Sequence, residues 1–400
     1  MQYIFYRYAS RTIVVHLSTY FLKLQEYHTS TGNNSGASQQ RRQDELTMTS
    51  NTLNANVGIQ EKAPSATSVI DNKHVTYRGN SSHSAIEEWI NYLPNVKWRN
   101  VAVISFVHLC ALYSLVTIDF TMNIKTVFWY ILICVIQGMG FTAGAHRYWT
   151  HRTFKAKLPL RIILVFCYLT AGQISIRNWV RDHRTHHKFT ETNADPYNSN
   201  RGFFFSHVGW LMVKKHPEVI KKGQQMDISD IKADSFVMFA DKHLFILNLI
   251  CGLLIPVMVP VYGWNETWTM SMKLHFFRHI FGWHTVWSVN SFAHMWGSRP
   301  YDMHIKPTNN VMVSFASFGE GSHNYHHVFP WDYKASEFGI HTYNFTAMFI
   351  EFFAKIGWAY DLQEPSPELV KSVAIKNKMA ERHYKWDAVP PPNGEGKIYS

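Results

Sequence analysis

The feature that most constrains this chain is a series of long apolar runs. An α-helix needs about 20 mostly apolar residues to cross the hydrocarbon core of a bilayer. Runs at 101–120, 126–145, 158–176 and 243–264 reach or approach that length, and a fifth at 270–291 is less uniform because it contains His275, Arg278, His279 and His284. The chain is therefore expected to be built around membrane-spanning helices.

The run at 158–176 differs from the others in its polar residues. It contains Pro159, Arg161 and Gln173 and is followed by Arg177, which suits a helix lying in the membrane interface better than a spanning one. We therefore predict an all-α membrane protein with four transmembrane helices, at 101–120, 126–145, 243–264 and 270–291, and an interfacial segment at 158–176.

The charge of the chain, +11, indicates how it is oriented. Sixteen lysines and arginines lie between positions 146 and 242, whereas 264–271 contains none. Because cytoplasmic loops carry the excess of basic residues, 146–242 and both termini are predicted to be cytosolic. Since the basic residues flank apolar runs, no nucleic-acid partner is expected.

Composition divides the chain into three parts. Residues 1–90 are rich in Ser, Thr, Asn and Gln and are predicted to be a disordered or poorly ordered extension. A transit peptide or surface helix at 1–25 is an alternative. Residues 91–362 form the membrane domain, and 363–400 a polar tail. The four cysteines lie inside apolar runs without metal-type spacing, so they are expected to be reduced and structural.

Histidine is the unusual residue here, with 23 copies, of which eight gather in three clusters. The clusters are "HRYWTH" (His146 and His151), "HRTHH" (His183, His186 and His187) and "HNYHH" (His323, His326 and His327). Spacing of i, i+3, i+4 places three imidazoles on one helix face. An H-x-x-H-H pattern is expected by chance roughly 0.08 times in such a chain. For isolated histidines such as His108 and His207 we expect no joint role.

These clusters predict a site for two metal ions. Zinc sites use three or four protein ligands, so eight or more histidines are too many for one ion. Imidazole suits iron, zinc, copper or nickel. Zinc has no evident task here because an "HExxH" motif is absent, whereas two iron ions that bind and reduce O₂ would suit the histidine set.

The clusters and their neighbours resemble a known family. "GAHRYWTH", "WVRDHRTHHKFTETNADPYN", "RGFFFSHVGW", "NSFAHMWGSRPYD" and "GEGSHNYHHVFPWDYKASE" together resemble the integral-membrane acyl-CoA desaturases of the stearoyl-CoA type, and "FPWDYKASEFG" is similar to insect members. The resemblance runs from about residue 98 to 361. It implies four transmembrane helices under a cytosolic helical cap that holds two Fe²⁺ ions.

The resemblance also implies a ligand set for each iron. One iron would bind His146, His151, His183, His187 and His326. The other would bind His186, His294, His323 and His327, with Asn290 completing its shell through a water. Asn290 and His294 are four residues apart, one helical turn, which suits joint presentation to a metal.

A fatty acyl-CoA needs cationic groups for its head and a narrow apolar channel for its tail. The family's substrate contacts fall on six positions, Asn100, Arg181, Asp182, Lys214, Lys215 and Trp287. Arg181 and Asp182 flank His183, so support of the metal cluster is an alternative role for them. Lys214 and Lys215 could instead form a solvated basic patch.

Three departures from the family pattern stand out. The stretch "QISIRNWVRDH" has Ile174, Arg177 and Asn178 where an Asn, a Tyr and an acidic residue are usual; Arg177 could compensate by binding a phosphate or pantetheine oxygen. Ser322 replaces an aromatic residue and is expected to loosen the surroundings of the histidines or admit water. Gly138 is expected near the closed end of the acyl channel, where it would leave room for a longer chain.

The resemblance implies an O₂-dependent reaction that forms a cis double bond, Δ9 by default. The electrons would come from cytochrome b5 on the basic cytosolic face, and the location would be the endoplasmic reticulum membrane. A membrane fatty-acyl hydroxylase using the same histidines is one alternative. An inactive relative that only binds acyl-CoA is another.

Overall fold

The computed structural model describes residues 95–119, 121–337 and 343–377. The prediction for 1–90 and the last part of the predicted tail lie outside these ranges. The helices up to residue 189 are α4 (Trp98–Val116), α5 (Ile124–Met139), the π-helix η2 (Gly140–Thr150), α6 (Leu158–Thr170) and α7 (Ile176–Phe189). Next come η3 (Ser199–Arg201), η4 (Phe205–Gly209), α8 (Trp210–Met212), α9 (Pro217–Gln224), α10 (Ser229–Ala233), α11 (Ser235–Lys242), α12 (Leu244–Leu247), η5 (Asn248–Leu254) and α13 (Ile255–Trp264). The remaining helices are α14 (Trp268–Met295), α15 (Val311–Ala316), α16 (His323–Val328), α17 (Phe345–Lys355) and α18 (Pro367–Lys376).

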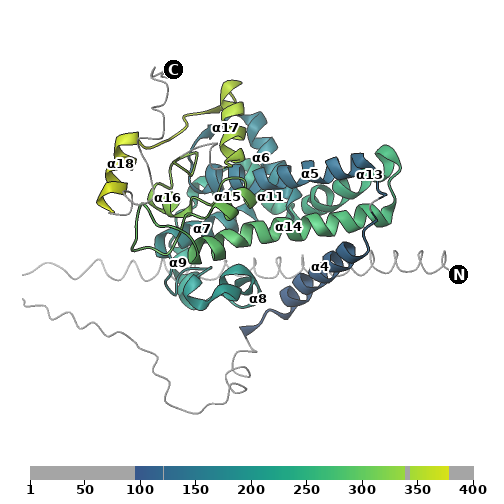
Figure 1. Ribbon diagram of the computed structural model, residues 1–400, viewed down its shortest axis with the longest axis horizontal. Helices are drawn as coiled ribbons and strands as arrows, with labels where there is room; N and C mark the ends of the chain where they lie inside the picture. Colours follow the sequence, from purple (N-terminus) through teal and green to yellow (C-terminus); the bar gives the residue numbers. More distant parts are fainter. Residues whose placement is uncertain (1–94, 120, 338–342, 378–400) are drawn as a thin grey trace, which may run out of the picture. The chain divides into compact units, whose positions relative to one another are not determined.

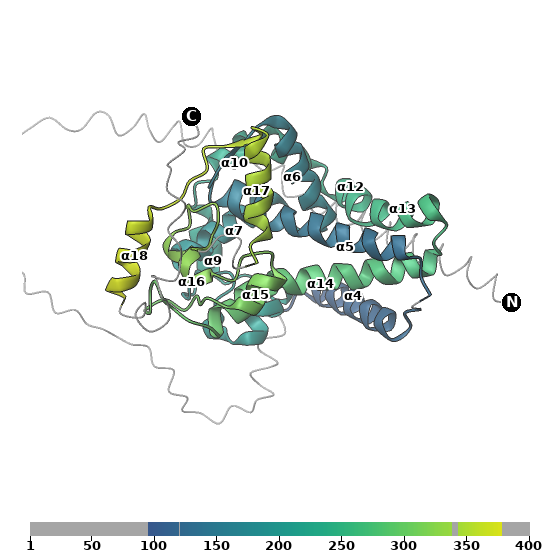
Figure 2. The same cartoon turned by 45° about the horizontal axis from the view of Figure 1, so that its top comes forward.

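Within the described ranges, three helices are long and apolar enough to cross a membrane, at Trp98–Val116, Ile124–Thr150 and Leu244–Trp264. They pack with α14, which contacts α4, α5 and α13 (Figures 1 and 2). The 28 residues of α14 extend over about 42 Å. Because α14 contains polar residues, it is not among the helices that are apolar enough to span. Its length is sufficient for a span, and the fourth transmembrane helix stays a prediction.

The ends of these helices are set by local signals. Asn123 begins α5 by accepting a hydrogen bond from the backbone N–H of Lys125, and Thr267 begins α14 in the same way with Met270. Asn265, with a left-handed backbone, ends α13. Glu266 then accepts a hydrogen bond from the hydroxyl of Thr126 at 2.7 Å, which ties the α13–α14 turn to the start of α5.

Helix α6 is short, with 13 residues, or about 20 Å, less than the hydrocarbon core requires. Its backbone lies against η2 at Gly140, where a Cβ would come 2.4 Å from the backbone of Cys167 and Tyr168. Its last carbonyl, Thr170, accepts a 3.1 Å hydrogen bond from buried Arg278 of α14. This length agrees with the predicted interfacial position, which stays a prediction.

The main core lies where η2, α6, α7 and α17 meet. It includes Phe141, Leu164, Tyr168, Val180 and Ile350, all nearly inaccessible to solvent. In the described ranges the only sheet is a two-residue antiparallel pair, β1 (Lys155–Ala156) with β2 (Ala359–Tyr360). This ribbon ties the start of α6 to the end of α17, beside the segment that carries His146 and His151.

The predicted tail at 363–400 begins with an ordered helix. Helix α18 buries Val370 and Ala374 against Tyr301, Tyr325 and Phe329. Asn377 at its end donates a hydrogen bond to the carbonyl of Arg299 at 2.9 Å. Because Tyr325 lies within "HNYHH", α18 supports the segment that presents these histidines.

Candidate metal centre

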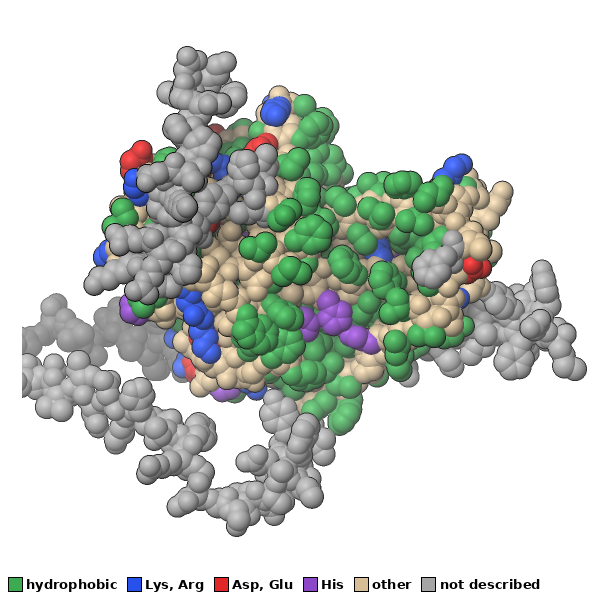
Figure 3. Space-filling view, in the orientation of Figure 1, with side chains coloured by type: hydrophobic (Ala, Val, Ile, Leu, Met, Phe, Trp, Pro, Cys, Tyr) green, Lys and Arg blue, Asp and Glu red, His purple; other side chains and the backbone are tan. Residues whose placement is uncertain are grey.

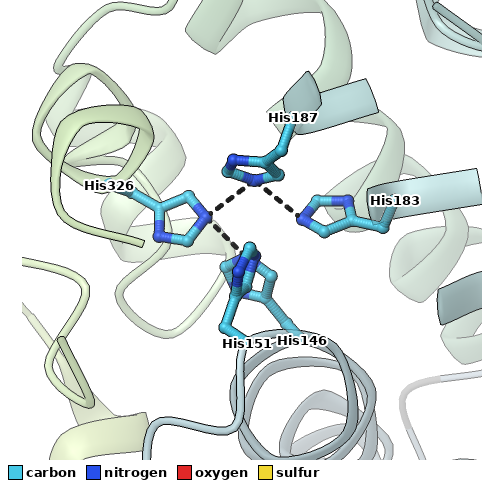
Figure 4. A group of neighbouring side chains, drawn as sticks. All are labelled: His146, His151, His183, His187 and His326. Carbon is cyan, nitrogen blue, oxygen red and sulfur yellow. Dashed lines mark hydrogen bonds between the residues drawn. The ribbon is translucent and has the colours of Figure 1, made fainter. Parts of the chain in front are cut away.

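The structure brings nine histidines together in two groups. The first contains His146, His151, His183, His187 and His326 (Figure 4), and the second contains His186, His294, His323 and His327. Within each group, one ring nitrogen from every member lies within 4.8 Å of those from the others. The division is the same as the one implied by the family resemblance.

Four helices present these side chains. His146 lies in η2 and His151 directly after it, His294 lies in the last turn of α14, and the two triplets lie on α7 and α16. Helix α7 begins where Ser175 accepts a hydrogen bond from the N–H of Asn178 and where Asp241 accepts one from Ile176 at 3.0 Å. Each triplet divides between the groups because adjacent helical residues point about 100° apart.

The spacing of ring nitrogens fits metal binding. Nε2 of His326 lies 2.9 Å from that of His146 and 3.0 Å from that of His187. In the second group Nε2 of His323 lies 3.0 Å from that of His294 and 3.1 Å from that of His327. Imidazole nitrogens bound at about 2.1 Å lie about 3.0 Å apart when their bonds meet at 90°, and about 3.4 Å apart at the tetrahedral angle. The donor sets therefore fit ions of higher coordination number than structural zinc.

Two further ring nitrogens are also suited to bind a cation. Nε2 of His151 and Nε2 of His186 are buried, and no described residue forms a hydrogen bond with either. A buried polar atom without a partner costs free energy. A bound cation would satisfy both atoms, and each belongs to a different group.

Three carboxylates lie behind the histidines, of which Glu320 and Asp195 are buried and Glu191 is partly buried. Asp195 is hydrogen-bonded to Nδ1 of His186 at 2.8 Å and Glu191 to Nδ1 of His294 at 2.9 Å, whereas Glu320 lies 2.8 Å from Nδ1 of His146 as an ion-pair contact without hydrogen-bond geometry. A carboxylate that accepts the Nδ1 proton fixes the ring and leaves the Nε2 lone pair for a metal. These acids lie within "ETNADPYN" and "GEGSHNYHH", but no spacing in the sequence marks them as partners of the histidines.

Glu320 is held as a carboxylate by its neighbours. Burial raises its pKa, but Arg147 and His146 outweigh burial and bring the pKa to about 2. Arg147 is itself buried and donates to Oε1 of Glu320 through Nε at 3.1 Å and a terminal nitrogen at 3.0 Å. Arg147 also donates to the carbonyl of Tyr333 at 2.8 Å. Arg147 in η2 is therefore bonded to Glu320 before α16 and to Tyr333 after it.

The electrostatics of both groups favour neutral imidazoles. Burial, followed by the neighbouring histidines, lowers the pKa well below 6.5 for a set of six: His151, His183, His187, His323, His326 and His327. Neutral imidazole is the form that binds metals.

Asn290 occupies the turn of α14 before His294 and is half-buried. No described residue forms a hydrogen bond with its side chain amide. Its role as a ligand through water stays a prediction.

The predicted head-group residues lie near one another. The side chain of Asn100 donates to the carbonyl of Leu211 at 2.8 Å, and the N–H of Lys214 donates to the carbonyl of Asn95 at 2.7 Å. Asp182 is buried and pairs with both Lys215 and Arg181. These contacts join the start of α4 to α7 and to the segment after α8.

A further lysine belongs to this area. Burial, followed by the charge of Lys215, lowers the pKa of Lys97. The backbone N–H of Lys97 donates to the carbonyl of Met212 at 2.7 Å. The sequence offered no specific signal for Lys97, because basic residues such as Lys97 and Arg99 are common just before an apolar run.

Trp287 is buried among three histidines that form a hydrogen-bonded chain. Nε2 of His284 lies 3.2 Å from Nε2 of His108, and Nδ1 of His284 lies 2.9 Å from Nε2 of His207. His108 also bonds the carbonyl of Ile104 through Nδ1 at 2.7 Å. The fold brings α4, η4 and α14 together at this point, so His108 and His207 meet through His284. Neither belongs to the metal-binding groups of the described residues, and the prediction that they have no joint role stays a prediction.

The residues that depart from the family pattern are also positioned. Arg177 lies one turn before Arg181 on α7, with Nε 3.8 Å from Asp241. Ile174 is exposed, and its carbonyl accepts a hydrogen bond from Tyr168 at 2.7 Å. Ser322 is buried and bonds the hydroxyl of Ser336 at 3.2 Å.

Gly138 does not leave an empty space. A Cβ at this position would come 2.4 Å from the ring of Phe318. The space that glycine vacates is therefore occupied by an aromatic side chain from the α15–α16 segment. The placement of Gly138 at the end of an acyl channel stays a prediction.

Comparison with known proteins agrees with this geometry. The fatty acid desaturase family profile matches residues 124–363. The chain is 52% identical to the acyl-CoA Delta-9 desaturase of Acheta domesticus, over 68% of this chain and 76% of that protein. It is 47% identical to the acyl-CoA Delta(11) desaturase of Spodoptera littoralis, over 69% and 82% of the two chains, and 47% identical to the stearoyl-CoA desaturase of Bos taurus, over 72% and 79%.

Proposed function

The chain belongs to the fatty acid desaturase family, and from this premise we propose that it is an integral-membrane acyl-CoA desaturase. It would introduce a cis double bond into a saturated long-chain fatty acyl-CoA. The observation that carries the proposal is the pair of buried histidine groups with carboxylates behind them. All nine histidines that the family resemblance implies are present and converge.

The metals are proposed to be two Fe²⁺ ions, one in each histidine group. Bound iron would supply the activation of O₂ and the removal of two hydrogen atoms from neighbouring methylenes. The protein would hold each ion with the Nε2 atoms of neutral imidazoles. Glu320, Asp195 and Glu191 would lie against the Nδ1 protons and fix the rings. Asn290 would hold a water beside the four-histidine group.

The substrate head is proposed to bind where α4, α7 and the segment after α8 meet. Lys214 and Arg181 would contact CoA phosphates, and Lys215, already paired with Asp182, would be held in place for the same purpose. Asn100 would donate a hydrogen bond, and Trp287 would form an apolar wall. Because Arg177 lies on the same face as Arg181 one turn away, it would provide an additional phosphate contact.

Catalysis by this chain would depend on how the acyl chain is positioned and on the exclusion of water from the site. The histidines lie in a core that is almost closed to solvent, so an acyl methylene held there would react away from bulk water. The position of the double bond depends on how the acyl chain is held. Delta-9 is proposed as the default, and the Delta(11) relative illustrates that the family includes another position.

Electrons are proposed to come from cytochrome b5 on the basic face at 146–242, with O₂ as the oxidant. The proposed location is the endoplasmic reticulum membrane, with the metal centre and both termini in the cytosol. Protease protection of tags placed at the two ends would test this orientation.

The decisive test is expression in a desaturase-deficient yeast, with the products identified by mass spectrometry. An alkene that depends on this chain is expected, and derivatisation gives its position. His183→Ala should abolish the product, while His304→Ala, outside both groups, should not. An alcohol would indicate the hydroxylase alternative. Normal iron binding without any product would indicate a protein that only binds acyl-CoA.

A further inference from the structure

Helix α17 has two apolar faces, although it lies outside the apolar runs of membrane length. Its inner face buries Ala347, Ile350 and Phe353. Its outer face exposes a stripe with spacing i, i+3, i+7, i+11, formed by Phe345, Met348, Phe352 and Ile356, of which Phe352 is 57% exposed. A stripe of this kind on a soluble surface would be an aggregation liability, so something is expected to cover it.

The depth of α17 follows from its contacts with the span that begins at Ile124. Thr346 forms a 2.8 Å hydrogen bond with Thr142 through their hydroxyls. Thr142 lies about 27 Å along the helix from Ile124, and a hydrocarbon core is about 30 Å thick. With Ile124 at one face of the hydrocarbon core, the first turn of α17 would lie at the opposite boundary, between the acyl chains and the head groups.

Phe318 confirms this depth from a second contact. Its ring packs against Gly138, about 21 Å along the same helix. It also lies 6.3 Å from the ring of Phe345, measured between centroids. The segment before α16 and the start of α17 are thus at bilayer depth, although both are far in sequence from any apolar run of spanning length.

Helix α6 lies beside α17 in both views (Figures 1 and 2). The β1–β2 ribbon joins the two, and the N–H of Lys157 donates to the carbonyl of Trp358 at 2.8 Å. Helix α6 exposes Leu158 and Ile162, each 49% accessible. Figure 3 shows apolar side chains gathered over these two helices as well as over the long ones.

The charges around the stripe also suit a lipid surface. Lys355 is exposed on the edge of the stripe in the last turn of α17, and Lys157 approaches Gly357 just after it. Lysines beside an apolar helix face place their ammonium groups among lipid phosphates. Glu351, the acid of α17, faces away from the stripe and accepts a hydrogen bond from Tyr333 at 3.1 Å.

We propose that α17 is an in-plane membrane helix, which lies beside α6 with Phe345, Met348, Phe352 and Ile356 inserted among the lipid acyl chains. The occupant of this face is the bilayer itself rather than a protein. The membrane contact would then extend beyond the spanning helices and hold the segment carrying the α16 histidines against the bilayer. The inference does not depend on the reaction catalysed.

The test uses a fluorescent bimane label on a single cysteine in lipid nanodiscs. The four native cysteines are replaced by serine, and iron content confirms that this background folds. Phe352→Cys is compared with Phe128→Cys on the apolar α5 and with Leu369→Cys on α18, which are 66% and 43% exposed. Two quenchers are used: lipids with a nitroxide on the acyl chain, and iodide in water.

Quenching of the label at 352 by nitroxide lipid should match that at 128 and exceed that at 369 several-fold. Iodide should quench the label at 369 more strongly than the labels at 352 and 128. Iodide quenching at 352 equal to that at 369 would overturn the proposal. Exclusion of both quenchers would also overturn it, because it would mean that protein, such as a second copy, covers the face. Met348→Cys provides a second site on the same stripe if the label at 352 disturbs folding.

Discussion

The ring of Phe318 occupies the space beside Gly138, so that a Cβ on residue 138 would meet it at 2.4 Å. Phe318 has a left-handed backbone, and its carbonyl accepts hydrogen bonds from both the N–H and the hydroxyl of Thr346. The backbone that carries the ring is therefore held in place by its contacts with the start of α17. Glycine at 138 and phenylalanine at 318 form one packing unit.

Substitution of Gly138 by leucine should test this unit. The new side chain would overlap the Phe318 ring, and overpacking of this kind costs about 1–3 kcal/mol of stability. Thermal unfolding in detergent measures the loss. The double variant Gly138→Leu/Phe318→Ala should recover most of it, because the ring that clashes is gone.

The same variants address chain length. If the acyl channel ends here, Gly138→Leu should shift the preferred substrate of the yeast assay towards shorter chains. Phe318→Ala alone should shift it towards longer ones. Unchanged chain length in both variants would place the end of the channel elsewhere.

Glu320→Gln should weaken one metal site selectively. The substitution removes the charge that faces His146 and Arg147, and loss of such a partner typically costs 10–100-fold in metal affinity. Iron per protein, measured after dialysis against a weak chelator, should fall towards half.

Two further variants serve as controls for Glu320→Gln. Glu191→Gln acts on the four-histidine group through His294, so the doubly substituted protein should lose more iron than either single variant. Glu218→Gln changes an exposed acid far from both groups and should retain all the iron. Full iron in Glu320→Gln would mean that the carboxylate serves only to pair with Arg147.

Removal of metal should make the protein sensitive to acid. The folded-state pKa values of His183, His187, His323 and His326 lie well below 6.5. Unfolded chains therefore bind more protons than the folded metal-free protein once the pH falls below about 6.5. Stability should be retained above that pH and decline progressively below it.

Unfolding of metal-free and iron-loaded protein between pH 7.5 and 5.5 measures this effect. Both forms should lose stability with a similar slope, because the ligand nitrogens bind few protons in the folded state with or without iron. Bound iron adds stability at each pH, so the metal-free protein should unfold at a higher pH. Stability of the metal-free protein that does not change over this range would contradict the prediction. A metal-free His183→Gln variant should show a shallower slope, since one titrating group is absent.

His284→Leu should disrupt the hydrogen-bonded histidines that surround Trp287. It leaves Nε2 of buried His207 without its partner, and an unsatisfied buried group costs about 1–3 kcal/mol. If Trp287 contacts substrate, KM for acyl-CoA should rise more than kcat falls. Glutamine at 284 retains hydrogen-bonding groups and should partly rescue KM. Thr285→Ala, on the neighbouring position, should change neither value.

Some features of the fold could be predicted from sequence because they depend on local spacing. Apolar runs at 101–120, 126–145 and 243–264 correspond to three helices of spanning length, each shifted by a few residues at one or both ends. The shift at the end of the second run is the largest, because the helix continues as η2 as far as Thr150. Polar residues such as His146 remain helical there because α6 and α7 pack around them.

The sequence by itself determined the nature of the site. Two H-x-x-H-H triplets on helices, with further histidines, predict a nitrogen-rich metal centre, since i, i+3, i+4 spacing is a local property of a helix. Only the tertiary structure decided the contacts that support them. His146 with Glu320, His294 with Glu191, and His284 with His108 join residues more than 100 positions apart. Local periodicity carries no information about such pairs, because they form only when separate helices pack.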